Sequence, residues 1–217
     1  LESMSSQVNE DEELAVTSNR RDRRKRETRD RIMKAARSLF AEQGYDGTKL
    51  TDICEKADIA HQTFFNHFPG KRDLMSELAR VGIDNLVASV EAAQCKGDST
   101  RERLQLFFEG FTRAALALGP KSREFMAVGI RATQEIHDEA QSRRVHDAFG
   151  ALVQQGLDEG DVTRRYELST LVELVVGTHY VLMSDWTLQP DLDVEKRARQ
   201  ISALLGDAIE KRPDESD

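Results

Sequence analysis

The sequence of 217 residues has little cysteine, little proline and few aromatic residues. Its two cysteines, Cys54 and Cys95, lie in different predicted helices without C-x-x-C spacing, so we expect neither a disulfide framework nor a zinc site. Proline interrupts helices and occurs only four times, while runs rich in Ala, Leu, Glu and Arg are long. The alternation of apolar and polar residues that is typical of strands is missing over any useful length. The composition therefore predicts an all-α protein.

Long hydrophobic runs are also missing. No apolar stretch approaches the roughly 18 residues that a membrane-spanning helix needs, and no signal peptide opens the chain. We therefore expect a cytoplasmic protein that does not enter a membrane. We also find no glycine-rich phosphate loop, nucleophile elbow or closely spaced acid and base, which disfavours an enzyme. His137 and His146 do not share a helix face cleanly, so a metal site is weakly supported and no cofactor is expected.

The net charge of −8 conceals an uneven distribution. Residues 1–19 carry five acids and no base, residues 20–74 carry fourteen bases and nine acids, and residues 75–217 carry seventeen bases and twenty-five acids. A basic segment in an acidic chain is expected when one small domain contacts phosphate and the rest faces away. We interpret residues 1–19 as an acidic tail, disordered or loosely held, with residues 1–3 as a cloning remnant ahead of Met4.

The basic segment contains predicted helices separated by short breaks. Their limits follow from residues that stop or start helices: Gly44 ends the first, Thr48 caps a second that runs through Ala57, Asp58 and Ile59 form a turn, Ala60 begins the third, and Pro69 and Gly70 precede a fourth from Lys71 to about Gln94. Three helices in about fifty residues, with a tight turn between the second and third, predict a helix-turn-helix head. In such a unit the later helix lies in the major groove of DNA.

The third predicted helix has an apolar side and a polar side. Ile59, Phe64 and Phe68 face the core, which leaves five residues outward: His61, Gln62, Thr63, Asn66 and His67. Gln62 suits a bidentate contact with adenine, and Thr63 suits a thymine methyl group or a phosphate. Lys71 would hold a phosphate together with nearby backbone N–H groups.

Residues from about 28 to 74 resemble the DNA-binding domain of the tetracycline-repressor (TetR) family of bacterial transcription regulators. The similarity rests on residues in register: Ile32, Ala36, Leu39, Phe40, Gly44, Tyr45, Thr48, Ile53, Ala57, Ile59, Thr63, Phe64, Phe65, Asn66, His67, Phe68, Lys71 and Leu74. The resemblance implies DNA contacts from His61, Gln62, Thr63, Phe65 and Asn66, phosphate contacts from Thr48, Lys49, His67 and Lys71, and a basic arm that includes Arg24 and Arg26.

Three residues depart from the family pattern. Asp58 replaces a usual turn glycine, which is tolerable because Asp adopts the left-handed region more readily than most residues. Ala60 replaces a usual serine N-cap, at a cost of about 1 kcal/mol. Phe65 replaces a usual tyrosine, so the hydroxyl that would bind phosphate is missing.

The basic run at residues 20–29 has two interpretations, a solvated helix end or an arm that contacts DNA. We favour the arm, because seven of these ten residues are basic, more than solubility requires. The acidic residues from Glu10 to Glu13 would weaken non-specific DNA binding if they folded back on the arm, which is a separate hypothesis.

Residues 75–217 predict a helical ligand-binding and dimerisation domain. Its helices are expected from Ser99 or Thr100 to about residue 118, and over about 120–136, 138–159, 166–186 and 193–211, which makes about nine helices in the chain. The last two resemble the helices that pair between subunits in the TetR family. A homodimer is also expected physically, because one short recognition helix buries too little surface for a specific site.

An effector pocket is expected inside this domain. The candidate lining is Leu86, Val90, Leu104, Phe107, Phe108, Phe111, Phe125, Met126, Phe149, Val175, His179 and Met183, although core packing explains each residue alone. The phenylalanine group favours an apolar or aromatic effector, with His179 or Arg131 as polar anchor. We therefore predict a repressor that binds a palindromic operator as a homodimer and is released by a small effector through the helix that follows the head. The alternatives are a ligand-independent regulator or activator and, less favoured, a small-molecule enzyme.

Overall fold

The computed structural model describes residues 2–117, 123–124, 126–127, 129–130 and 139–212, with side chains from residue 20 onward. The chain divides into two compact units, residues 1–74 and residues 75–217. The described helices are α1 (Glu2–Gly47), α2 (Leu50–Lys56), α3 (His61–Phe65), α4 (Lys71–Gln94), α5 (Thr100–Ala117), α7 (Glu139–Glu159), α8 (Leu168–Leu188) and α9 (Val194–Ile209). The predicted all-α fold is confirmed, and the helix expected over 120–136 lies largely outside the described residues.

Helix α1 includes the acidic stretch for which we expected no regular structure. It runs without interruption from Glu2, and Gly44 has φ 76° and ψ 168°, so the regular helix ends where the sequence predicted. Residues 2–43 contain neither proline nor glycine. A helix that is already nucleated extends through such residues at little cost, which accounts for the helical form of residues 2–19.

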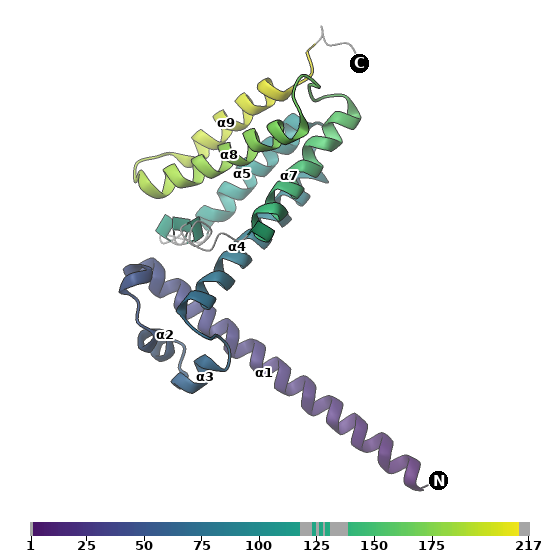
Figure 1. Cartoon of the computed structure of the whole chain (residues 1–217), viewed down its shortest axis with the longest axis vertical. Helices are drawn as coiled ribbons and strands as arrows, with labels where there is room; N and C mark the ends of the chain where they lie inside the picture. The colour runs from purple at the N-terminus through teal and green to yellow at the C-terminus, as the bar shows by residue number, and fades with distance from the viewer. Residues whose placement is uncertain (1, 118–122, 125, 128, 131–138, 213–217) are drawn as a thin grey trace. The chain divides into compact units, whose positions relative to one another are not determined.

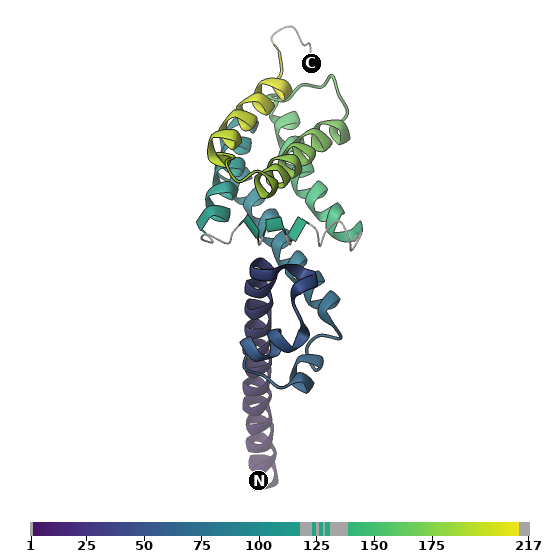
Figure 2. The same ribbon diagram turned by 90° about the vertical axis from the view of Figure 1, so that its left-hand side faces the viewer.

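The core of the first unit forms between α1 and the two short helices after it, which Figure 2 shows beside α1. The inward face of α1 consists of residues three or four apart: Ile32, Ala35, Ala36, Leu39 and Phe40, all buried. Phe64 of α3 and Phe68 pack with ring centroids 5.9 Å apart. This apolar contact fixes α3 with its opposite side toward solvent.

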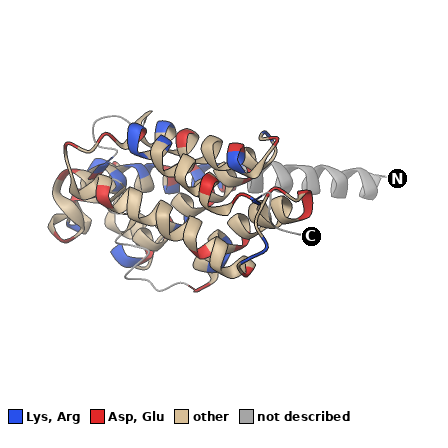
Figure 3. Ribbon diagram, turned by 90° about the horizontal axis from the view of Figure 1, so that it is seen from above, with Lys and Arg blue, Asp and Glu red and all other residues tan. Residues whose placement is uncertain are grey.

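In the second unit α5, α7, α8 and α9 run alongside one another (Figure 1), with α5 packed mainly on α9 and α7 mainly on α8. Phenylalanine rings from α5 and α7 meet in the core, where the centroids of Phe107 and Phe149 are 4.9 Å apart. The ribbon of this unit carries both signs of charge along its helices (Figure 3). None of the helices in the described part of the chain has the length and apolar character needed to cross a bilayer.

Polar side chains fasten the start of α5 to the end of α7. Arg103 is buried, and its two terminal nitrogens donate to the Glu159 carboxylate at 2.7 and 3.0 Å. Its Nε donates to the Gly97 carbonyl at 3.1 Å. Hydrogen bonding from Arg103 holds the pKa of Glu159 below its usual value. Beside this pair, the backbone N–H and the hydroxyl of Thr100 donate to Asp161 at 2.6 and 2.8 Å.

Candidate DNA interface and effector site

The turn between α2 and α3 has the tight geometry that the sequence predicted. Asp58 has φ 52°, the positive value for which we expected Asp to stand in for glycine. The Ile59 N–H donates to the Cys54 carbonyl at 3.0 Å, which closes the turn. Ala60 is the N-cap of α3, and no side chain caps it, as its identity requires. Its carbonyl accepts from the Thr63 and Phe64 amides at 2.9 and 3.2 Å, so the backbone alone starts the helix.

Helix α3 presents polar side chains to solvent. His61, Gln62 and Asn66 are exposed and Thr63 is partly exposed, whereas Phe64 is fully buried. The Gln62 side-chain amide donates to Asn66 Oδ1 at 3.4 Å, a long bond that a base edge can replace. Phe65 is 50% exposed, which leaves its ring open to a partner.

The loop before α2 differs from the prediction. Lys49, and not Thr48, is the N-cap residue of α2. The Lys49 N–H donates to the Asp52 carboxylate at 3.0 Å, and this bond is the main reason that the pKa of Asp52 is lowered. Thr48 is buried, and its hydroxyl donates to the Gly44 carbonyl at 2.7 Å. The Thr48 side chain therefore holds the loop against the end of α1, while the exposed Lys49 remains available for phosphate.

Lys71, for which we predicted a phosphate contact, is engaged within the first unit. Its ammonium donates to the carbonyls of Tyr45 and Thr48 at 2.7 and 3.0 Å. It also lies 4.2 Å from the centroid of the Tyr45 ring, within cation–π distance. Two of its three N–H donors are therefore used to hold the loop between α1 and α2, and at most one is left for phosphate.

The basic arm is part of α1, with Arg24 and Arg26 exposed on it. Arg29, farther along the helix, lies 4.4 Å from the centroid of the Phe68 ring and donates to the His67 carbonyl at 3.3 Å. Burial, followed by the charges of Lys25 and Arg29, lowers the pKa of His67. Sequence reasoning counted Arg29 among the arm bases and missed this contact, because the partners are 38 residues apart.

This geometry, a tight turn and a short helix with a polar outer face beside a basic helix, defines a helix-turn-helix DNA-binding protein. Residues 32–78 match the model of the bacterial regulatory proteins of the tetR family. The regulator UidR of Escherichia coli K12 is 25% identical over 183 residues, 82% of this chain and 88% of UidR. IcaR of Staphylococcus aureus Newman, a negative regulator of a biofilm operon, is 32% identical over 82 residues, 37% of this chain and 44% of IcaR.

Solved structures show a similar fold. The crystal structure of FadR from Bacillus subtilis, in complex with stearoyl-CoA, matches with a TM-score of 0.70 and 18% identity over 81% of this chain and 96% of FadR. Residues 32–78 are therefore a DNA-binding domain of the TetR family of transcriptional regulators, as the resemblance predicted. The relatives are regulators and not enzymes, in agreement with the reading of the sequence.

The candidate effector residues gather in the core of the second unit. His179 of α8 is buried among phenylalanine rings from α5 and α7, with centroid distances of 5.1 Å to Phe107, 4.9 Å to Phe111 and 6.5 Å to Phe149. Burial lowers the pKa of His179 to about 4, so its imidazole is neutral at pH 7. Its Nδ1 has no hydrogen-bond partner among the described residues.

Most of the other predicted lining residues that are described belong to the same core. Phe108, Val175 and Met183 are buried in the same core, and Met126 packs against it while partly exposed. Phe125, Arg131 and His137 lie outside the described residues. Over the part of the chain that is described, no three His, Cys, Asp or Glu residues are placed to hold a metal ion.

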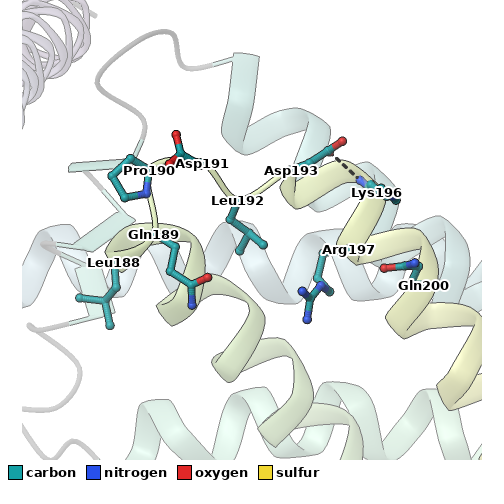
Figure 4. Close-up of a pocket in the computed structure, with 9 residues that line it drawn as sticks. All are labelled: Leu188, Gln189, Pro190, Asp191, Leu192, Asp193, Lys196, Arg197 and Gln200. Carbon is teal, nitrogen blue, oxygen red and sulfur yellow. Dashed lines mark hydrogen bonds between the residues drawn. The ribbon is translucent and has the colours of Figure 1, made fainter.

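A hollow that the sequence did not predict lies at the loop between α8 and α9 (Figure 4). Its volume is about 590 Å³, and it is lined by Leu188, Gln189, Pro190, Asp191, Leu192, Asp193, Lys196, Arg197 and Gln200. Asp193 caps α9 there by accepting from the Lys196 N–H at 2.9 Å. The lining includes four charged side chains, so its chemistry differs from the phenylalanine and histidine cluster in the core.

Proposed function

We propose that this TetR-family regulator is a repressor that binds a palindromic operator as a homodimer and is released by a small apolar or aromatic effector. In this proposal residues 20–74 bind DNA, and residues 75–217 bind the effector and the second subunit. A regulator of bacterial genes acts in the cytoplasm, and we infer that location from DNA binding. The observation that carries the proposal is the exposed polar face of α3 next to the basic part of α1.

The proposed DNA contacts are assigned by exposure and chemistry. Base edges or sugar are contacted by four polar side chains: His61, Gln62, Thr63 and Asn66. The exposed ring of Phe65 contacts sugar or thymine methyl groups. Phosphates are bound by five groups: Arg24, Arg26, Lys49, His67 and the remaining donor of Lys71. Thr48 contributes through the shape of the loop, because its hydroxyl is occupied.

A homodimer is supported by apolar side chains that stay exposed on the last two helices. These are Leu174, Tyr180, Val181 and Leu188 on α8 and Leu204 on α9, with exposures of 43, 41, 54, 74 and 67%. Burying such side chains in an interface stabilises it by about 25 cal/mol per Å² of apolar surface removed from water. Two copies of the five-residue α3, about 34 Å apart on successive turns of the major groove, would double the contact with DNA.

Two relatives support effector binding and repression. FadR from Bacillus subtilis was crystallised with stearoyl-CoA, and IcaR is a negative regulator. In the proposal, effector binding to the second unit acts through α4, which begins at Lys71 next to α3 in sequence and continues into the second unit. If the effector binds one arrangement of α4 more tightly than another, it shifts the protein toward that arrangement. The operator affinity can then change by at most the difference between the two effector-binding free energies.

The decisive experiment is selection of bound fragments from bacterial genomic DNA by the purified full chain, followed by anisotropy titrations on the selected site. We expect an inverted repeat. Gln62→Ala should reduce affinity about tenfold and relax preference at one base position. The matched control is Gln154→Ala, which removes an exposed amide of α7 that bonds to Asp158. Sites without two-fold symmetry, or equal losses in both variants, would contradict the proposal.

The arm is tested by the salt dependence of the same titration. Because each phosphate contact releases about one counterion, Arg24→Ala with Arg26→Ala should lower the slope of log affinity against log salt by about 2. Lys96→Ala, at an exposed base of the second unit, is the control. An unchanged slope in the double variant would assign the basic run to solubility alone.

A further inference from the structure

We infer that the effector is an uncharged, mainly apolar molecule with a hydroxyl group that hydrogen-bonds to His179 Nδ1 inside the phenylalanine cluster of α5 and α7. This inference rests on the proposed function, since it assumes that the second unit binds an effector. It adds the charge of that effector and the polar group by which it is recognised.

Four phenylalanine rings pack around His179. Phe107, Phe108 and Phe111 of α5 approach it with centroid distances of 5.1, 6.0 and 4.9 Å. Phe149 of α7 lies 6.5 Å away and packs edge-on against Phe107. Rings in edge-to-face arrangement favour apolar and aromatic partners. A ligand in contact with this cluster therefore meets mostly hydrocarbon.

Within this cluster, the imidazole of His179 has an unsatisfied atom. His179 is only 8% exposed, and its buried Nδ1 has no hydrogen-bond partner among the described residues. An unpaired polar atom in an apolar core is unfavourable, and a core histidine whose only role is packing is replaceable by phenylalanine. The unpaired Nδ1 is thus a built point of attachment for one polar group.

The charge of that polar group follows from the cations in the unit. The imidazole is neutral at pH 7, so it supplies no positive charge for a carboxylate. Arg103 is the buried cation among the described residues of this unit, and Glu159 already occupies its guanidinium. Among the described residues, a carboxylate brought to His179 would find no buried cation free to pair with it, and the loss of its hydration would be strongly unfavourable.

A hydroxyl fits the remaining requirement. A neutral imidazole has a donor at one ring nitrogen and an acceptor at the other, and either tautomer places one of these at Nδ1. A hydroxyl both donates and accepts, so it pairs with Nδ1 in both tautomers. Groups that only donate or only accept pair with one tautomer.

The test uses two sets of probes with a common skeleton: ethylbenzene, 2-phenylethanol and phenylacetate, and naphthalene, 2-naphthol and 2-naphthoate. Calorimetry on the full wild-type chain should show, in at least one set, that the alcohol binds about tenfold more tightly than the hydrocarbon. The carboxylate should bind most weakly. Failure of both alcohols to bind, or tighter binding of a carboxylate or hydrocarbon, would overturn the inference.

Two variants identify His179 as the partner of the hydroxyl. His179→Phe keeps an apolar ring and should bind alcohol and hydrocarbon equally. His179→Asn places an amide near the position of Nδ1 and should keep the preference. His146→Phe is the matched control, because His146 lies on α7 with its Nδ1 already bonded to the Ser142 carbonyl at 2.9 Å, and it should behave as wild type. A preference that persists in His179→Phe overturns the inference.

Nitrogen chemical shifts show whether the alcohol or a water molecule pairs with Nδ1. In long-range ¹H–¹⁵N spectra the His179 signal, identified by its loss in His179→Phe, should shift with the alcohol and not with the hydrocarbon. An unchanged signal would overturn the assignment. Release of the selected DNA is measured in the same samples. An alcohol that binds at His179 without releasing DNA contradicts the proposed regulation and leaves the ligand assignment intact. A probe that releases DNA without binding at His179 supports the proposed regulation and contradicts the ligand assignment.

Discussion

The two units of the chain use polar side chains in opposite ways. In the first unit, Gln62 lies on the outside of the five-residue α3, and it bonds only weakly to Asn66, the exposed C-cap residue of that helix. In the second unit, His179 lies among four phenylalanine rings on a helix of 21 residues. The exposed amides are suited to a large, polar and hydrated partner. The buried imidazole is suited to a small partner that carries its own apolar surface.

The difference also concerns stability. The α3 segment depends on backbone caps and on one buried ring, Phe64, so changes on its outer face should affect binding and leave folding intact. In the second unit the polar groups are within or beside the core, so changes there should affect folding as well. The following predictions test this contrast, from the largest expected effect to the smallest.

Arg103→Ala should lower the free energy of unfolding by about 3 to 5 kcal/mol, because it removes a buried guanidinium that pairs with Glu159 and satisfies the Gly97 carbonyl. Urea denaturation measures the loss. Arg101→Ala is the control two residues away, where the ion pairs with Asp207 and Glu210 are largely exposed and should contribute less than about 1 kcal/mol. Similar losses in the two variants would remove the distinction between buried and exposed charge.

His179→Phe should change how stability depends on pH. The pKa of this histidine is about 4 in the fold against a reference value of 6.5, so between these pH values the unfolded chain binds more protons than the folded chain. Stability is therefore lost as pH falls from 6.5 to 4, by about 3 kcal/mol at about 1.4 kcal/mol per pH unit. The variant should lack this loss and gain about 1 kcal/mol at pH 7. Parallel stability curves for variant and wild type would contradict a buried neutral imidazole.

Ala60→Ser should stabilise the start of α3 by about 1 kcal/mol, because the serine hydroxyl can accept from a free amide of the first turn. Slower hydrogen exchange of the α3 amides measures the effect. Ala41→Ser, inside α1, is the control and should be neutral or slightly destabilising. No slowing of exchange in α3 would mean that other groups already satisfy its first turn.

Phe65→Tyr should increase affinity for the selected DNA about fivefold, because the ring is half exposed and the added hydroxyl supplies one bond to phosphate. The free energy of unfolding should stay within about 0.5 kcal/mol of wild type. Tyr166→Phe, which removes the hydroxyl of an exposed tyrosine of the second unit, should not change DNA affinity. An unchanged affinity in Phe65→Tyr would place this ring away from the backbone of DNA.

Local sequence signals predicted much of the fold. The bounds of α4 agree at Lys71 and Gln94, and the positive φ of Asp58 was expected from a turn that usually needs glycine. Periodicity correctly assigned Phe64 and Phe68 to the core. These features depend on residues within one or two helical turns, where spacing and capping chemistry determine the outcome.

Features that depend on distant partners were not predicted. Lys71 reaches carbonyls 23 and 26 residues away, and Thr48 turns inward to Gly44 where a cap was expected. No local pattern encodes these choices, because backbone carbonyls are available at every position. His179 was predicted to line a pocket because the same domain is rich in phenylalanine. That its Nδ1 has no partner depends on how α5 and α7 pack around it, which the sequence does not reveal. The DNA and effector contacts themselves stay predictions.

The fixed ammonium of Lys71 has a consequence for the thermodynamics of DNA binding. A free lysine side chain carries about 2 kcal/mol of rotamer entropy, which is lost when a phosphate orders it. In this protein the Tyr45 and Thr48 carbonyls have already ordered it. The rotamer entropy of Lys71 is therefore lost when the first unit folds. A phosphate that binds its third N–H orders no further lysine rotamers, so this entropy does not oppose DNA binding.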